Sequence, residues 1–147
     1  MTTDTITVGH ETLAFRVTGE QSSGALVAID VRMPPGGGPP MLHRHDAFEA
    51  YRVDSGELAF YLEQDGGHVA RTVAGPGSVV AIPGGREHTI RNESGGEAEA
   101  LVVFTPGSEM EAFAREAGTL ADPGPADVMA VAAAHGIEIT RGLEGIA

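Results

Sequence analysis

The sequence predicts an all-β sandwich or barrel over about residues 5–105, followed by a short helical appendage. β-type runs recur at short intervals, turns rich in glycine and proline separate them, and helical periodicity is missing throughout this stretch. Segments such as PPGGGPP, DSGE and AGPG have turn-forming compositions. We expect strands at Thr12–Thr18, Ala25–Met33, Phe48–Val53, Glu57–Glu63, Val69–Val73, Ser78–Ile82, His88–Asn92 and Ala98–Phe104.

A first helix is predicted after Pro106, where the composition changes. Ser108 and Glu111 have the spacing of a capping box, in which each side chain satisfies a free backbone N–H group near the helix start. We therefore expect a helix from Ser108 to about Ala117, ended by Gly118.

A second helix is predicted over roughly Ala126–His135, because Gly136 stands where a left-handed C-cap belongs. We expect residues 1–107 to form the β-domain. Residues 108–147 are expected to be an extension packed on that domain or on a neighbouring subunit, and not a second domain.

Composition excludes several classes of function. The chain has 147 residues, a net charge of −12 and no cysteine, so disulfides, thiolate metal sites and a cysteine nucleophile are ruled out. All basic residues are arginines, which excludes Schiff-base chemistry, and so acidic a surface repels nucleic acid and anionic lipid. Without a signal segment or a long apolar run, we expect a soluble cytoplasmic protein.

The most informative pattern is a set of three histidines and one carboxylate. His43 and His45 are two residues apart, Glu49 follows four residues later, and His88 comes about forty residues further on. Residues two apart on a strand face the same side, so the first two histidines can bind one ion. Such a set suits Fe, Mn, Ni, Co, Cu or Zn, and about two positions of a six-coordinate ion stay open, as in a catalytic site.

Glycines and a proline frame both halves of this pattern. The halves read Gly37-x5-His43-x-His45-x3-Glu49-x6-Gly56 and Gly77-x5-Pro83-x-Gly85-x2-His88-x3-Asn92. These paired motifs resemble those of the cupin superfamily, closely over about residues 37–92. The resemblance implies a double-stranded β-helix, the cupin jelly-roll barrel, with one divalent transition metal ion held in its mouth by His43, His45, Glu49 and His88. The chain is similar to small single-domain bacterial cupins called quercetin-dioxygenase-like in the broad sense.

Tyr51 is a candidate catalytic residue because it shares the inward side of its strand with Glu49. Its hydroxyl could donate a hydrogen bond to a substrate or to bound oxygen. The alternative is a core tyrosine whose hydroxyl finds a backbone partner.

Arg86 is a second candidate, placed two residues before His88. It could pair with an anionic substrate or enolate, or simply form a surface salt bridge. Glu87 could serve as a base or be solvated, and Asn92 is expected to stabilise a turn.

The resemblance implies a metal-dependent dioxygenase that acts on a small, mainly apolar, phenolic or enolisable substrate. Two alternatives stay open: a metal-dependent isomerase, cyclase or decarboxylase, and a non-catalytic protein that binds a small molecule. A homodimer is expected by resemblance, and a polar N-terminal strand such as Thr5–Gly9 would suit exchange across its interface.

Overall fold

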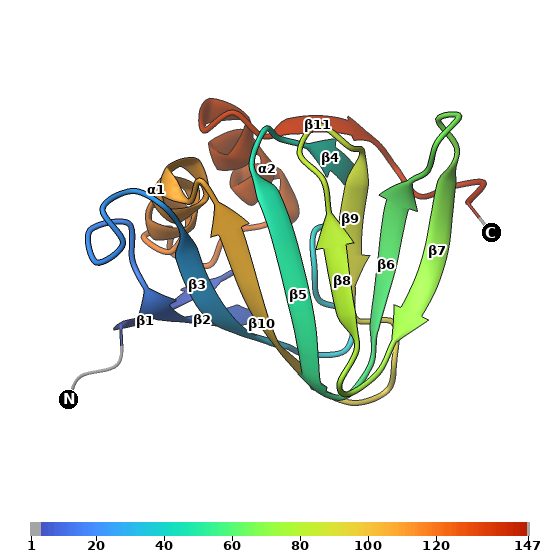
Figure 1. Cartoon of the computed structure of the whole chain (residues 1–147), viewed down its shortest axis with the longest axis horizontal. Coiled ribbons are helices and arrows are strands. Elements are labelled where there is room, and N and C mark those ends of the chain that lie inside the picture. Colours follow the sequence, from blue (N-terminus) through green and yellow to red (C-terminus); the bar gives the residue numbers. More distant parts are fainter. Residues whose placement is uncertain (1–3, 147) are drawn as a thin grey trace.

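The computed structural model describes residues 4–146 as two antiparallel sheets that enclose a core, with two helices near the C-terminus (Figure 1). The larger sheet has the order β1 (Asp4–Val8), β2 (Glu11–Val17), β3 (Val27–Met33), β10 (Ala98–Thr105), β5 (Phe48–Ser55) and β8 (Val79–Ile82). The smaller sheet has the order β11 (Glu138–Arg141), β4 (Leu42–Arg44), β9 (His88–Arg91), β6 (Leu58–Glu63) and β7 (Val69–Ala74). The predicted fold class, all-β with C-terminal helices, is confirmed.

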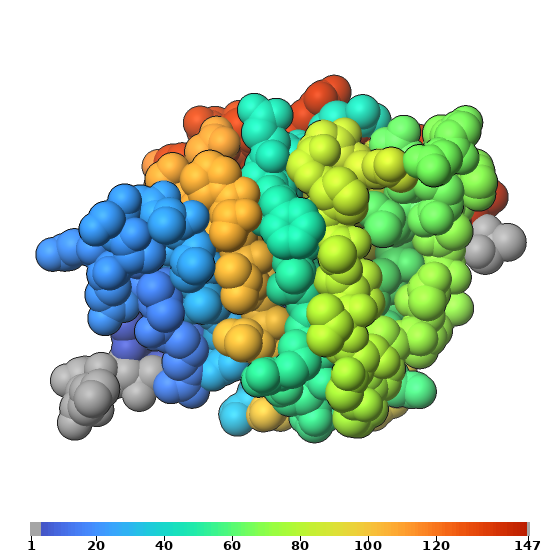
Figure 2. Space-filling model, viewed as in Figure 1, coloured from blue at the N-terminus to red at the C-terminus, as the bar shows by residue number. Residues whose placement is uncertain are grey.

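The core lies between the sheets because inward and outward residues alternate along the central strands. Strand β10 buries every second residue, from Ala98 to Phe104. Strand β5 likewise buries Glu49, Tyr51 and Val53, which confirms the predicted parity around the carboxylate. The outer face of the larger sheet is a continuous surface from β3 through β10 and β5 to β8 (Figure 2).

Strand ends differ from prediction where turns are stabilised by local hydrogen bonds. Strand β3 begins at Val27, because Ala25 donates its N–H to the Ser22 carbonyl over 3.2 Å in the preceding turn. Strand β8 begins at Val79, since Ser78 belongs to the preceding turn, where its N–H donates to the Gly75 carbonyl over 3.1 Å. Strand β11 was not predicted at all, and it pairs with β4 at the edge of the smaller sheet.

The N-terminal strand β1 pairs with β2 of the same chain over its whole length. Between residues 4 and 146, no helix is long and apolar enough to cross a membrane.

Helix α1 (Ser108–Ala117) has the predicted limits, but the predicted capping box is wrong. Gly107 is the N-cap and no side chain caps the helix. A Cβ on Gly107 would lie 2.5 Å from the Val27 nitrogen, so the chain passes too close to β3 for a larger residue. The Glu111 carboxylate instead accepts hydrogen bonds from the Gly19 N–H over 2.8 Å and from Arg115 Nε over 3.0 Å.

Helix α2 (Pro125–Ala134) begins one residue before its predicted start, with the proline in its first turn. The Asp127 carboxylate accepts a hydrogen bond from the Gly124 N–H over 2.9 Å, which satisfies one free donor at the helix start. Gly136 has the left-handed φ of +79° that a C-terminal cap requires, as predicted.

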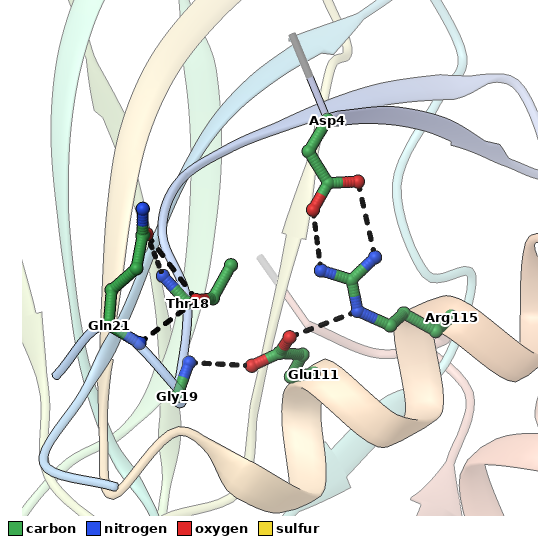
Figure 3. A network of polar contacts seen from close by, with 6 residues as sticks. All are labelled: Asp4, Thr18, Gly19, Gln21, Glu111 and Arg115. Atoms are coloured by element: carbon green, nitrogen blue, oxygen red, sulfur yellow. Dashed lines mark hydrogen bonds and ion pairs between the residues drawn. The ribbon is translucent and has the colours of Figure 1, made fainter. Parts of the chain in front are cut away.

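Arg115 holds α1 against the first two strands (Figure 3). Its guanidinium donates two hydrogen bonds to the Asp4 carboxylate, over 2.7 and 3.2 Å, and one to Glu111. It also lies over the ring of Phe15, 4.2 Å from the centroid. The fixed position of α1 therefore depends on charge and cation–π contacts as well as on apolar burial.

Candidate metal centre

The three predicted histidines meet at one point between the sheets. His43 lies on β4, His45 follows directly after it, and His88 begins β9. His43 and His88 are directly opposite each other in the antiparallel pairing of the two strands. All three side chains are buried, and one nitrogen of each lies within 4.8 Å of the others. The fold thus brings together candidate metal ligands from two distant parts of the sequence.

Each imidazole is oriented by a main-chain carbonyl two residues away. A carbonyl only accepts hydrogen bonds, so Nδ1 of each ring must donate, and Nε2 is left free to bind a metal. The Nδ1–O distances are 3.2 Å from His43 to Met41, 3.0 Å from His45 to Ala47 and 2.8 Å from His88 to Arg86.

Glu49 reaches the histidines from β5 of the opposite sheet. Its side chain is 2% exposed, and Oε1 lies 3.0 Å from His45 Nε2 and 2.6 Å from His88 Nε2. Two ligands each about 2.1 Å from one ion, at right angles to one another, would be about 3.0 Å apart. His88 Nε2 is buried and makes no hydrogen bond of acceptable geometry within the described residues. An orphaned ring nitrogen beside a carboxylate fits a metal ion.

For His43 and Glu49, the electrostatics of the site favour the protonation states that bind a metal. Burial and the nearby charge of His88 lower the pKa of His43 to about 4, so its ring is neutral at pH 7. Burial alone would raise the pKa of Glu49, but close contacts with His45 and His88 and their charges bring it well below its ordinary value. For His88, burial lowers the pKa, while contact with Glu49 and its charge gives a net increase.

Tyr51 lies beside Glu49, as the parity of β5 predicts. Its ring is buried and stands edge-on to Phe60, with the centroids 5.3 Å apart. Burial raises the pKa of the Tyr51 hydroxyl well above its usual range. The charge of Glu49 and a hydrogen bond with Glu49 add to this increase. The hydroxyl is therefore protonated at neutral pH and close to the carboxylate.

Arg86 contributes its carbonyl to the site and directs its guanidinium elsewhere. The guanidinium donates hydrogen bonds to the Glu63 carbonyl over 3.0 Å and to the Asp65 carboxylate over 2.9 Å. These contacts favour the salt-bridge alternative, and an interaction of Arg86 with a substrate stays a prediction.

The sequence offered two roles for Glu87, a free base or a solvated residue, and the structure supports neither. Its side chain is buried and accepts a hydrogen bond from Arg141 on β11 over 3.1 Å. Burial alone would raise the pKa of Glu87, but the hydrogen bond from Arg141 brings it below its ordinary value. Asn92 has the expected role in a turn, since its amide donates to the Met33 and Gly96 carbonyls over 2.8 Å.

Sequence reasoning missed the contribution of β11 to the surroundings of the histidines. Ile139 pairs directly opposite His43. No local signal marked this strand, because it is short and its partner lies almost a hundred residues earlier. Phe104 also borders the histidines, with its ring centroid 6.3 Å from that of His45.

Comparison with known proteins identifies the family. The model of the cupin domain matches residues 29–104, which is more than half of the chain. The chain therefore belongs to the cupin family, which accords with the two sheets and the histidine site. No curated protein matches it.

Solved structures of cupin enzymes resemble this fold. Oxalate decarboxylase from Bacillus subtilis is 25% identical with a TM-score of 0.62, and the match covers 72% of this chain and 28% of that one. A cupin described as a sugar phosphate isomerase, from Silicibacter pomeroyi, is 25% identical with a TM-score of 0.52, over 65% of this chain and 59% of that one. The chain therefore spans just over a quarter of the oxalate decarboxylase. That decarboxylase has Mn(II) centres, and the group of His43, His45 and His88 can hold a metal ion here.

Proposed function

We propose that this cupin is a metal-dependent dioxygenase that acts on a small phenolic or enolisable substrate. The observation that carries the proposal is the convergence of three imidazole nitrogens and the Glu49 carboxylate between two sheets. Four protein ligands leave about two positions of a six-coordinate ion for small molecules. Bound there, the metal would orient the substrate and supply Lewis acidity.

The chain's own residues supply proton handling in this proposal. Glu49 is ionised, and Oε2, the carboxylate oxygen not directed at His45 and His88, can accept the proton of a substrate hydroxyl. Tyr51 keeps its proton and can donate a hydrogen bond to the resulting oxygen anion. Apolar side chains such as Phe60, Ile82 and Phe104 are almost fully buried in the core and keep water away.

A second candidate is a reaction that consumes no oxygen, namely decarboxylation or isomerisation. It is favoured by the structural matches, since the similar proteins named above are a decarboxylase and a sugar phosphate isomerase. The same ligands would serve, with Glu49 or Tyr51 moving the proton. The two candidates differ in whether oxygen disappears as substrate is used.

The first experiment measures metal content and oxygen uptake together. Protein purified without chelators is compared with the His45→Ala/Glu49→Ala double variant, and with a His68→Ala/Glu57→Ala control that changes two exposed residues. We expect about one equivalent of metal in the native and control proteins and almost none in the double variant. The loaded protein is then screened for oxygen uptake with phenols and enolisable diketones.

Each result decides between the candidates. Oxygen uptake that the double variant lacks supports the dioxygenase. Turnover without oxygen uptake overturns it in favour of decarboxylation or isomerisation. A native protein that contains no metal and refuses added metal overturns both enzymatic proposals and indicates a binding protein.

A further inference from the structure

The C-terminal segment forms a side wall between the edges of the two sheets. Helix α1 packs against β1 and β3 of the larger sheet, α2 packs against α1, and β11 packs against α2. Strand β11 in turn extends the smaller sheet beyond β4 (Figure 1). Met110 and Phe113 of α1 also pack on the main apolar core. The wall therefore stands on the side of the barrel where β4 carries His43.

One residue of this wall lies beside a metal ligand. Ile139 pairs directly with His43, and paired residues of antiparallel strands point to the same face with their Cβ atoms about 5 Å apart. His43 faces the other histidines, so Ile139 faces the same space. Its neighbour Glu138 pairs with Arg44, on the opposite face, and is exposed.

The side chain of Ile139 is half-buried. The two apolar clusters found among the described residues do not include it, whereas Ile137 close by is 4% exposed. Its side chain is therefore partly accessible, and its partner across the strand pair is His43.

Strand β11 is held firmly enough to act as a wall. Arg141 pairs with the buried Glu87, which immediately precedes the ligand His88. Beyond the strand, Leu143 and Ile146 pack against the apolar cluster around Leu42 on β4. The strand is thus fixed to the elements that carry two of the histidines.

We propose that Ile139 is a specificity-determining residue, which limits the size of the molecules that reach the open positions of the metal. The inference rests on the proposed metal centre, and it assigns the C-terminal strand to the binding site. A branched side chain next to His43 occupies volume that a bulky ligand would need. A smaller side chain should admit such a ligand, and a change on the opposite face of β11 should not.

The test uses the full-length protein loaded with Co(II), whose visible spectrum reports on ligands that bind the metal. Imidazole serves as the small probe and 4-phenylimidazole as the bulky one. The variants are Ile139→Ala, the milder Ile139→Val, and Glu138→Ala as the matched control on the outer face. Cobalt content is measured in each variant, so that a loss of the site is not mistaken for a change in access.

We expect Ile139→Ala to bind 4-phenylimidazole about tenfold more tightly or better, on the scale that a few methylenes contribute in an apolar pocket. Its affinity for imidazole should stay within about twofold, Ile139→Val should be intermediate, and Glu138→Ala should match the native protein. Equal affinities in all cobalt-loaded variants would overturn the role of Ile139 and leave the metal centre intact. A gain in Glu138→Ala as large as in Ile139→Ala would overturn it too. A native protein that binds no cobalt would overturn the metal centre, and this inference with it.

Discussion

Three main-chain carbonyls orient the three imidazoles, so the site depends on the backbone as much as on the ligands. That His43, His45, Glu49 and His88 meet could be predicted, because their spacing within two short motifs is visible in the sequence. The carbonyls of Met41, Ala47 and Arg86 could not, because a carbonyl belongs to every residue and its direction depends on the folded backbone. For Arg86, the sequence leaves open a contact with substrate or a surface salt bridge. Only the folded position of Asp65 favours the salt bridge.

Glu49→Gln tests the charge of the carboxylate at nearly constant shape. The amide keeps an oxygen ligand but loses the negative charge, so we expect Mn(II) to bind at least about tenfold more weakly. The measurement is the rise in Tm with increasing Mn(II), which yields the apparent affinity. Glu57→Gln, at an exposed position, is the control and should behave as the native protein. Equal Mn(II) affinities for Glu49→Gln and native protein would show that Glu49 is no ligand.

His43 should make the metal-free protein sensitive to acid. Its folded pKa of about 4 lies below the ordinary 6.5, so the folded state binds fewer protons than the unfolded state. The contribution of His43 to the free energy of unfolding is fully present above pH 6.5 and is lost as the pH falls toward 4. The loss is on the order of 3 kcal/mol. Urea unfolding at pH 7 and pH 4 should show a smaller loss in His43→Gln, because that side chain does not titrate. His88, whose pKa is raised, is present in both proteins, so the difference between their losses reports on His43. An equal loss in the two proteins would contradict the expectation, and His68→Gln should lose as much as the native protein.

Strand β11 shows what sequence reasoning misses at the scale of an element. The longer strands were predicted because alternation and flanking turns are local signals, as in β5 and β10. The four residues of β11 carry too short a pattern, and their pairing with β4 is a distant contact. The predicted capping box of α1 failed for a similar reason, since Gly19 and Arg115 occupy the Glu111 carboxylate.

Arg141→Gln should loosen β11 without unfolding the barrel. The change leaves the buried Glu87 without its charged partner, while Arg141 itself is half-exposed, so we expect a loss of about 1 kcal/mol in the free energy of unfolding. Hydrogen exchange of the amides of Glu138–Arg141 should become faster, and exchange in β5 should not change. Arg52→Gln, which breaks an exposed pair with Asp54, is the control. Unchanged protection of β11 in Arg141→Gln would show that backbone pairing alone holds the strand.

At the scale of the molecule, the resemblance to small cupins predicts a homodimer. The outer face of the larger sheet carries charges of both signs, among them Arg32 paired with Glu99 and Arg52 paired with Asp54. Such a face can meet a copy of itself without accumulating like charge. Light scattering at micromolar concentration should give twice the 15.1 kDa of one chain, and a monomer would contradict this prediction.

The metal should act as a cross-link between the two sheets. His43 and His88 come from the smaller sheet and Glu49 from the larger one, so an ion bound to all three would join the two sheets. An ion that binds only the folded state adds about 2.7 kcal/mol when its free concentration is a hundred times Kd. We therefore expect Tm to fall when a chelator removes the metal and to recover when Mn(II) is returned. The His45→Ala/Glu49→Ala variant should show one Tm under all three conditions, while His68→Ala/Glu57→Ala should follow the native protein. A native Tm that does not respond to chelator or Mn(II) would mean that no ion bridges the sheets.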